Sequence, residues 1–367
     1  MSDVHAMLQE ILQHHASAFP GFAAQPTPAP TSPDPVYQAA LQACSALGFI
    51  THDAECVAHA WQARSARMGH FAPTPWPDEP QDFGLQPAPR RSAFASCPQQ
   101  LGLYAVLPDA VWVGRMARAG VPTVQLRFKS DDCAAVAREV TAAVQAVQGT
   151  QALLFINDHW RQAIEAGAYG VHLGQEDLDA LQPSELQALQ ASGLRLGVST
   201  HGYAEMVRAD AVGPSYVALG AVFPTTLKKM ATAPQGIGRL AAYARLMQGY
   251  PLVAIGGIGA DQFGEVLGTG VGSIAVGHRS APGSVHTLGS GLRCSSSSSS
   301  RRTSTRSLAM PKPIGWSGRG ATVTGTGGRS LSVRCGGSDK SRSSSWDSVG
   351  APGFRTALLE SSGAAGA

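Results

Sequence analysis

The stretch that decides the fold runs from Leu153 to Leu178 and reads LLFINDHWRQAIEAGAYGVHLGQEDL. It contains an apolar run that ends in Asn157 and Asp158, then an amphipathic segment, then a second short apolar run that leads into Asp177. This order predicts a β-α-β unit with an acidic residue after each strand. Ligands of parallel α/β folds bind at the carboxyl ends of the strands, so Asp158 and Asp177 can converge on one cation or proton.

The same alternation of apolar runs and helical stretches extends over residues 102–276. Eight apolar runs predict strands, at residues 102–107, 123–128, 152–157, 170–174, 195–200, 216–223, 251–256 and 273–276. Helical periodicity lies between them, for example at 132–147, 159–166, 183–191 and 238–247. Eight strands with crossover helices in about 175 residues favour a compact (β/α)8 TIM barrel over residues 101–277, with an open doubly wound sheet as the alternative.

The first 100 residues read as an N-terminal extension without a recognisable chemical motif. Residues 1–18 predict a short amphipathic helix, and residues 36–68 predict a further helical segment. Two proline-rich stretches, 20–35 and 69–100, predict a linker and an extended wrap or tether. No phosphate loop, dinucleotide fingerprint or nucleophile elbow occurs in this part of the sequence.

The sequence loses its pattern where an eighth helix is due. Residues 281–367 include 21 serines, with an unbroken run from Ser295 to Ser300, and almost no aliphatic periodicity. Such a composition cannot bury a core, so residues 278–367 are predicted to be a disordered tail. We also consider that the tail is an out-of-frame reading, because the deletion of one G from a GGT CAC CGC codon run at Gly277 to Arg279 would extend SIAV to SIAVVTA.

Charge and cysteine usage restrict the possible partners. The net charge of +3 combines +8 in residues 281–367 with −5 in the rest of the chain, so no folded basic face for nucleic acid is indicated. The six cysteines include no CxxC pair, which gives no sign of a zinc site or a disulfide framework. We read a cytoplasmic protein without a membrane segment, and the sequence leaves open a homo-oligomer.

Three polar residues alternate in QLRFK, after the second predicted strand. Gln125, Arg127 and Lys129 would point the same way from an extended chain, and two cations with one amide suit a polyphosphate. A solvated strand edge is the alternative for this motif alone.

The third and fourth strands contribute oxygen ligands. Asn157 and Asp158 follow one strand and Asp177 follows the next, and two carboxylates with an amide oxygen and water suit Mg2+. An isolated aspartate at such a position is more often a helix N-cap.

Later strands contribute further polar groups at the same end of the predicted barrel. Ser199 follows the fifth strand, Thr225 and Lys228 follow the sixth, and Gly257 lies in IGGIG after the seventh, where a bare backbone admits a phosphate. His201 is compatible with a helix cap or a packed residue. His172, inside the fourth strand, is interpreted as a packed barrel residue rather than a ligand.

The ordered motifs QLRFK, INDHW, GVHLGQEDL, GVSTH, FPTTLKKMA and AIGGI resemble thiamine phosphate synthase, a family whose Mg2+-dependent barrel joins hydroxymethylpyrimidine diphosphate to thiazole phosphate. The resemblance implies pyrimidine diphosphate contacts from Gln125, Arg127, Lys129, Asn157 and Ser199, and Mg2+ ligands at Asp158 and Asp177. It also implies a thiazole contact at Thr225, a pyrophosphate contact at Lys228 and a phosphate contact at Gly257. Arg127, Lys129 and Lys228 would then assist departure of pyrophosphate. Two other readings remain, a thiazole tautomerase-like relative and a non-catalytic barrel that binds thiamine precursors.

Overall fold

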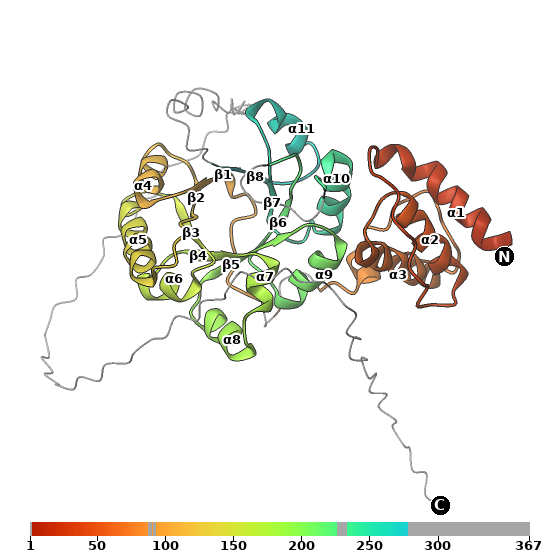
Figure 1. Cartoon of the computed structure of the whole chain (residues 1–367), viewed down its shortest axis with the longest axis horizontal. Helices are drawn as coiled ribbons and strands as arrows, with labels where there is room; N and C mark the ends of the chain where they lie inside the picture. The colour runs from red at the N-terminus through yellow and green to blue at the C-terminus, as the bar shows by residue number, and fades with distance from the viewer. Residues whose placement is uncertain (1, 87–89, 91–92, 226–232, 278–367) are drawn as a thin grey trace, which may run out of the picture. The chain divides into compact units, whose positions relative to one another are not determined.

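The computed structural model of the chain describes residues 2–86, 90, 93–225 and 233–277 (Figure 1). Eight parallel strands close into a barrel in the order of the sequence, because β1 pairs with β2 on one side and with β8 on the other. The strands are β1 (Gly102–Leu107), β2 (Thr123–Leu126), β3 (Leu153–Asn157), β4 (Gly170–Leu173), β5 (Arg195–Thr200), β6 (Tyr216–Gly220), β7 (Leu252–Ile255) and β8 (Ser273–Gly277). The predicted (β/α)8 architecture is confirmed, and closure excludes the open doubly wound sheet.

Helices connect the strands and surround the barrel (Figure 1). They are α4 (Ala110–Arg118), α5 (Cys133–Ala146), α6 (Trp160–Ala166), α7 (Gln175–Asp179), α8 (Pro183–Ala191), α9 (Tyr203–Val212), α10 (Gly236–Leu246) and α11 (Phe263–Leu267), the last preceded by the 3-10 turn η3 (Ala260–Gln262). The predicted tail lies outside the described residues, so the expected disorder there and the missing closing helix stay predictions.

Aromatic side chains fill the interior of the barrel. Tyr104, Phe155 and Tyr216 are buried, and their ring centroids lie 5.2 to 5.9 Å from one another. Glycine makes room for them, because a Cβ atom on Gly197 would collide with the Tyr216 ring and one on Gly170 would lie 2.5 Å from the Phe155 ring. This packed layer is the floor beneath the carboxyl ends of the strands.

The N-terminal extension is helical, as predicted. Its helices are α1 (Ser2–His15), α2 (Pro35–Ala46) and α3 (Thr51–Met68), with the 3-10 turns η1 (Ala16–Ala18) and η2 (Pro80–Phe83). The predicted helical segment at 36–68 is divided into two helices at Gly48, where φ is +80° and a side chain would contact Phe22. Such a left-handed residue ends a helix, and glycine adopts it at the least steric cost.

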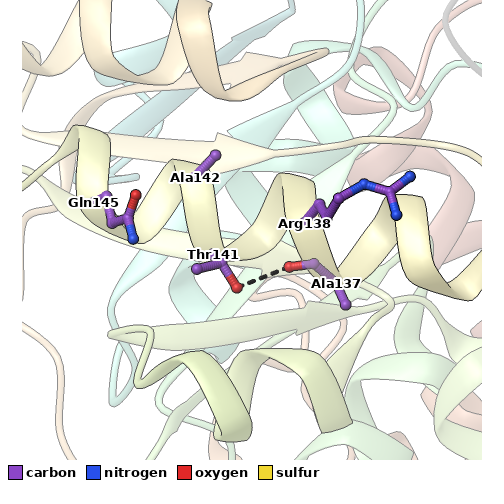
Figure 2. Close-up of a pocket in the computed structure, with 5 residues that line it drawn as sticks. All are labelled: Ala137, Arg138, Thr141, Ala142 and Gln145. Atoms are coloured by element: carbon purple, nitrogen blue, oxygen red, sulfur yellow. Dashed lines mark hydrogen bonds between the residues drawn. The ribbon is translucent and has the colours of Figure 1, made fainter.

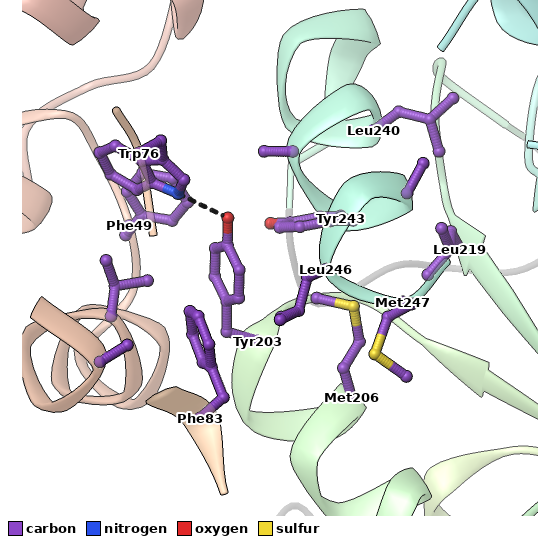
Figure 3. Close-up of a cluster of buried hydrophobic side chains, with 14 of the residues drawn as sticks. Phe49, Trp76, Phe83, Tyr203, Met206, Leu219, Leu240, Tyr243, Leu246 and Met247 are labelled. Carbon is purple, nitrogen blue, oxygen red and sulfur yellow. Dashed lines mark hydrogen bonds between the residues drawn. The ribbon is translucent and has the colours of Figure 1, made fainter. Parts of the chain in front are cut away.

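The extension shares its core with the barrel helices α9 and α10. Phe49, Trp76 and Phe83 of the extension pack with Tyr203 of α9 in one buried cluster (Figure 3). The Trp76 indole N–H donates a hydrogen bond of 2.8 Å to the Tyr203 hydroxyl, which gives this buried donor an acceptor. The described residues accordingly fall within one compact unit.

The described residues of the proline-rich stretch 69–100 are largely extended, as predicted, and contact the barrel helix α9 and its end. The Gln86 N–H donates to the Asp210 carboxylate at 2.9 Å, and the Phe94 N–H donates to the Gly213 carbonyl at 2.8 Å. Within the described ranges, the helices are all too short or too polar to cross a membrane.

Candidate functional site

The carboxyl ends of the barrel strands bring together the predicted site residues that the structure describes. Gln125 lies in β2, and Arg127 and Lys129 follow it. The remaining positions are Asn157 at the end of β3 with Asp158 next to it, Asp177 in α7 after β4, Ser199 in β5, Thr225 after β6 and Gly257 after β7. Lys228 lies outside the described residues. All strands are parallel, so these nine positions lie at one face of the barrel.

Two amides meet at the ends of β2 and β3. The Gln125 side-chain NH2 donates a hydrogen bond of 3.0 Å to the Asn157 side-chain oxygen, and both residues are buried. The bond orients each amide and leaves the Gln125 oxygen and the Asn157 NH2 to meet a ligand. The two amides can therefore bind a ligand that carries both a hydrogen-bond donor and a hydrogen-bond acceptor.

A cation and an acid meet beside the amides. The Lys129 Nζ lies 3.5 Å from the Asp158 carboxylate, with side-chain exposures of 57% and 27%. So exposed a pair contributes at most about 1 kcal/mol to stability. The charges are thus accessible to a ligand, and an anion that approaches Lys129 also approaches the acid.

Asp158 has an unusual backbone. Its φ is +64°, and it is the only residue other than glycine with a positive φ among the described residues. The Asp158 N–H donates to the His172 carbonyl of β4 at 3.0 Å, which holds the turn. Such conformations cost about 1 kcal/mol and concentrate at functional positions.

Asp158, next to the end of β3, and Asp177, in α7, are the two acids predicted to hold Mg2+. The Asp177 carboxylate lies over Gly174, with one oxygen 3.3 Å from where a Cβ atom would stand. Within the described ranges, no group of three or more His, Cys, Asp or Glu side chains gathers around one point. Mg2+ is commonly held by one or two carboxylates together with water and substrate phosphates, so a pair of acids suits this ion better than an all-protein cage.

A chain of hydrogen bonds leads from the barrel floor to Ser199. The Tyr104 and Tyr216 hydroxyls lie 2.8 Å apart, Tyr216 lies 2.7 Å from His172 Nδ1, and His172 Nε2 lies 2.8 Å from Ser199 Oγ. The interpretation of His172 as a packed residue agrees with its burial but missed these partners. Its polar side chain at an inward strand position was the available signal.

Two neighbours complete the surroundings of Ser199. The Gln175 side-chain NH2 donates to the Ser199 carbonyl at 2.7 Å. His201 Nδ1 and the His201 backbone N–H both contact the Glu205 carboxylate, at 2.7 Å and 2.8 Å. His201 is thus engaged just before α9, whose N-cap is Gly202 without a side-chain cap hydrogen bond, so the alternative of a helix cap was wrong.

Gly257 offers exposed backbone after β7. Its φ is +70°, and a Cβ atom would collide with the Pro224 carbonyl oxygen, so glycine is required here. Thr225, the residue after Pro224, is half-buried beside this turn. The phosphate contact at Gly257 stays a prediction.

A hollow of about 340 Å³ lies elsewhere, on α5 (Figure 2). Ala137, Arg138, Thr141, Ala142 and Gln145 line it, and the Thr141 hydroxyl donates to the Ala137 carbonyl at 2.8 Å. All five residues belong to one helix outside the barrel, so this hollow is separate from the strand ends.

A closed barrel with amides, cations and acids at its ligand-binding face defines a (β/α)8 protein suited to a phosphorylated small molecule. The sequence profile described as "Thiamine monophosphate synthase" matches residues 103–279. A thiamine-phosphate synthase of Neisseria meningitidis serogroup B is 54% identical over 182 residues, which cover 50% of this chain and 87% of the relative. One of Yersinia pestis strain Pestoides F is 49% identical, over 50% of this chain and 84% of the relative.

The chain belongs to the thiamine monophosphate synthase family. Among solved structures, a thiamine phosphate pyrophosphorylase from Pyrococcus furiosus is 30% identical, over 48% of this chain and 85% of that chain, with a TM-score of 0.42. The family profile covers the barrel, and the N-terminal extension lies before the matched region.

Proposed function

We propose that the protein is a transferase, a thiamine phosphate synthase that joins hydroxymethylpyrimidine diphosphate to thiazole phosphate and releases pyrophosphate. The observation that carries the proposal is the contact between Lys129 and Asp158 at the barrel rim, where a diphosphate would meet a cation and a metal ligand together. The buried Gln125 and Asn157 amides beside it suit a polar heterocycle. The names of the relatives support the same reaction.

The reaction needs charge stabilisation more than proton transfer. The bond between the pyrimidine methylene carbon and the diphosphate oxygen breaks, and its electron pair leaves with pyrophosphate. The thiazole nitrogen then uses its lone pair to form the new carbon–nitrogen bond, so no general base is required. Arg127, Lys129 and Lys228 stabilise the charge that grows on the leaving group, which is electrostatic catalysis by preorganised groups.

Asp158 and Asp177 would hold Mg2+, which neutralises phosphate oxygens when it is bound. Gly257 and Thr225 would anchor the thiazole phosphate through backbone and hydroxyl groups. Each substrate would therefore be fixed by a different part of the rim, the pyrimidine at β2 to β5 and the thiazole at β6 to β7. Positioning of this kind brings the nitrogen into line with the methylene carbon.

Release of pyrophosphate tests the proposal. The full chain with both substrates and Mg2+ should release pyrophosphate, and Asp158→Ala or Asp177→Ala should lower the rate by at least about 100-fold. Glu176→Ala is the matched control, because Glu176 is an exposed acid on the same short helix as Asp177, and it should keep the wild-type rate.

Each failure has a distinct meaning. A folded wild-type protein that releases no pyrophosphate would favour the non-catalytic reading, a barrel that only binds thiamine precursors. Unchanged turnover in the two aspartate variants would refute the metal ligands. A tautomerase-like activity is less well supported, because that reaction needs neither the acids nor the diphosphate cations.

A further inference from the structure

The chain of four side chains beneath the site spans the barrel from wall to wall. Tyr104 comes from β1, His172 from β4, Ser199 from β5 and Tyr216 from β6. Tyr104 and Tyr216 are at most 2% exposed, and His172 is 9% exposed. Ser199, at the upper end of the chain, is half-buried and lies closest to the ligand-binding face.

Gly197 makes this chain of hydrogen bonds possible. In the barrel register Gly197 of β5 lies between His172 of β4 and Tyr216 of β6. Any Cβ atom at this position would collide with the Tyr216 ring and hydroxyl. The missing side chain therefore lets Tyr216 reach across β5 to His172, and the two rings stack with 5.7 Å between centroids.

The hydrogen bonds of the chain have a preferred direction. Among the described residues, the Tyr104 hydroxyl has one hydrogen-bond partner, the Tyr216 hydroxyl. A buried hydroxyl hydrogen without an acceptor is more costly than an oxygen with a spare lone pair, so Tyr104 donates to Tyr216. Tyr216 must then donate its own hydrogen to His172 Nδ1.

This direction fixes the tautomer of a neutral His172 and the role of Ser199. With Nδ1 acting as acceptor, the ring proton is on Nε2, which donates to Ser199 Oγ. One lone pair of the Ser199 oxygen then accepts this bond, and the hydroxyl hydrogen points away from His172. A ligand at this point meets a hydrogen-bond donor.

We propose that His172, held by Tyr216 and Tyr104, is a positioning residue that presents the Ser199 hydroxyl as a hydrogen-bond donor to an acceptor nitrogen of a heteroaromatic ring. This inference rests on the proposed function, in which the ring is the aminopyrimidine. A ring that offered no acceptor there would leave the Ser199 hydroxyl hydrogen without a partner. The hydrogen-bond chain thus favours a ring with an acceptor nitrogen at this point.

The inference is tested by calorimetry, which measures the dissociation constant of hydroxymethylpyrimidine diphosphate from the full-length protein. Tyr216→Phe keeps the ring but removes the hydroxyl, so it should weaken the dissociation constant about five-fold, as expected for one lost neutral hydrogen bond. Ser199→Ala should weaken it similarly. In the double variant the second change should add less than about two-fold, because Tyr216 acts through Ser199.

Four further variants separate positioning from stability. Tyr250→Phe is the matched control, since it also removes a buried tyrosine hydroxyl, one that donates to Asp210 at 2.6 Å, and it should leave the dissociation constant unchanged. His172→Gln keeps an N–H near Ser199 and should retain more affinity than His172→Leu. If Tyr216→Phe fails to fold, Tyr104→Phe tests the same chain one step further from the ligand.

The outcomes distinguish this inference from the proposed function. Additive effects of Tyr216→Phe and Ser199→Ala, or an equal loss in Tyr250→Phe, would overturn the positioning role. If the same variants raised the KM of thiazole phosphate as much as that of the pyrimidine diphosphate, the positioning role would also be overturned, because the hydrogen-bond chain ends at the pyrimidine side alone. Tight binding of the pyrimidine diphosphate without turnover would refute only the proposed reaction, and absent binding in the wild type would refute both.

Discussion

Asp158 has a strained backbone conformation and a carboxylate with a proposed chemical role, and two substitutions can separate their effects. Its φ of +64° is unfavourable for any residue with a Cβ atom, and its carboxylate lies 3.5 Å from Lys129. Asp158→Gly should therefore be more stable than Asp158→Ala by about 1 kcal/mol, because glycine relieves the left-handed conformation. Both variants should lose pyrophosphate release, since neither has a carboxylate.

Urea unfolding measured beside the activity assay checks this prediction at the residue scale. Gly167 at the end of α6 is the control, because its φ is +68° and nothing lies within 4 Å of a Cβ atom built on it. Gly167→Ala should cost about 1 kcal/mol through the same backbone effect and leave activity intact. Equal stability of Asp158→Gly and Asp158→Ala would show that the turn stores no strain.

At the scale of single elements, α9 depends on an acid from the extension. Asp53 of α3 is buried, and its carboxylate accepts a hydrogen bond of 2.9 Å from the Ala204 N–H in the first turn of α9. Burial raises the pKa of Asp53 to about 6, although the Ala204 hydrogen bond lowers it. Gly202 is needed beside it, because a Cβ atom there would collide with the carboxylate.

This raised pKa predicts a pH dependence of stability. The unfolded value is about 3.9, so the folded protein binds the proton more tightly. The resulting stabilisation, on the order of 2 to 3 kcal/mol, is fully present below pH about 4 and is lost as pH rises through about 6. Asp53→Asn keeps an oxygen acceptor but has no proton to lose, so its advantage over the wild type should grow between about pH 4.5 and about pH 7.

Urea unfolding of both proteins across that range is the measurement. Asp53→Ala serves for comparison, because it removes the charge and also leaves the Ala204 N–H without its acceptor, which should cost about 1 to 3 kcal/mol. Parallel pH profiles for the wild type and Asp53→Asn would contradict the prediction.

The elements were predictable from the sequence where local patterns dominate. All eight predicted strands are present, because short apolar runs such as LLFIN and GVHL become strands buried by helices. The meeting of Gln125 with Asn157 also follows from neighbouring strands. The chain through His172 did not follow, because Tyr104 and Tyr216 lie 112 residues apart and meet only inside the closed barrel. Ligand binding by the predicted residues stays a prediction.

On the scale of the whole molecule, the sequence did not predict what the N-terminal extension packs against. Its contacts join residues far apart in the chain, 127 residues for Trp76 with Tyr203 and 151 residues for Asp53 with Ala204. No periodicity within residues 1–100 indicates such partners. The structure makes the extension part of the barrel's outer packing, since it covers α9 and α10.

That packing predicts a steric requirement at Gly238. Gly238 lies in α10, and a Cβ atom there would collide with the Ala18 carbonyl oxygen of the extension. The obstacle is backbone, so the extension itself must move. Gly238→Ala should therefore lower the free energy of unfolding by about 1 to 3 kcal/mol, although alanine is the better helix former.

Gly264 of α11 supplies the matched control, because nothing lies within 4 Å of a Cβ atom built on it. Gly264→Ala should be neutral or stabilise the protein by up to about 1 kcal/mol. Tryptophan fluorescence reports the movement, since Trp61 and Trp76 are at most 5% exposed and a displaced extension would shift their emission to longer wavelength. Unshifted emission and unchanged stability in Gly238→Ala would contradict the prediction. They would mean that the packing of the extension against α10 at Gly238 does not contribute to stability.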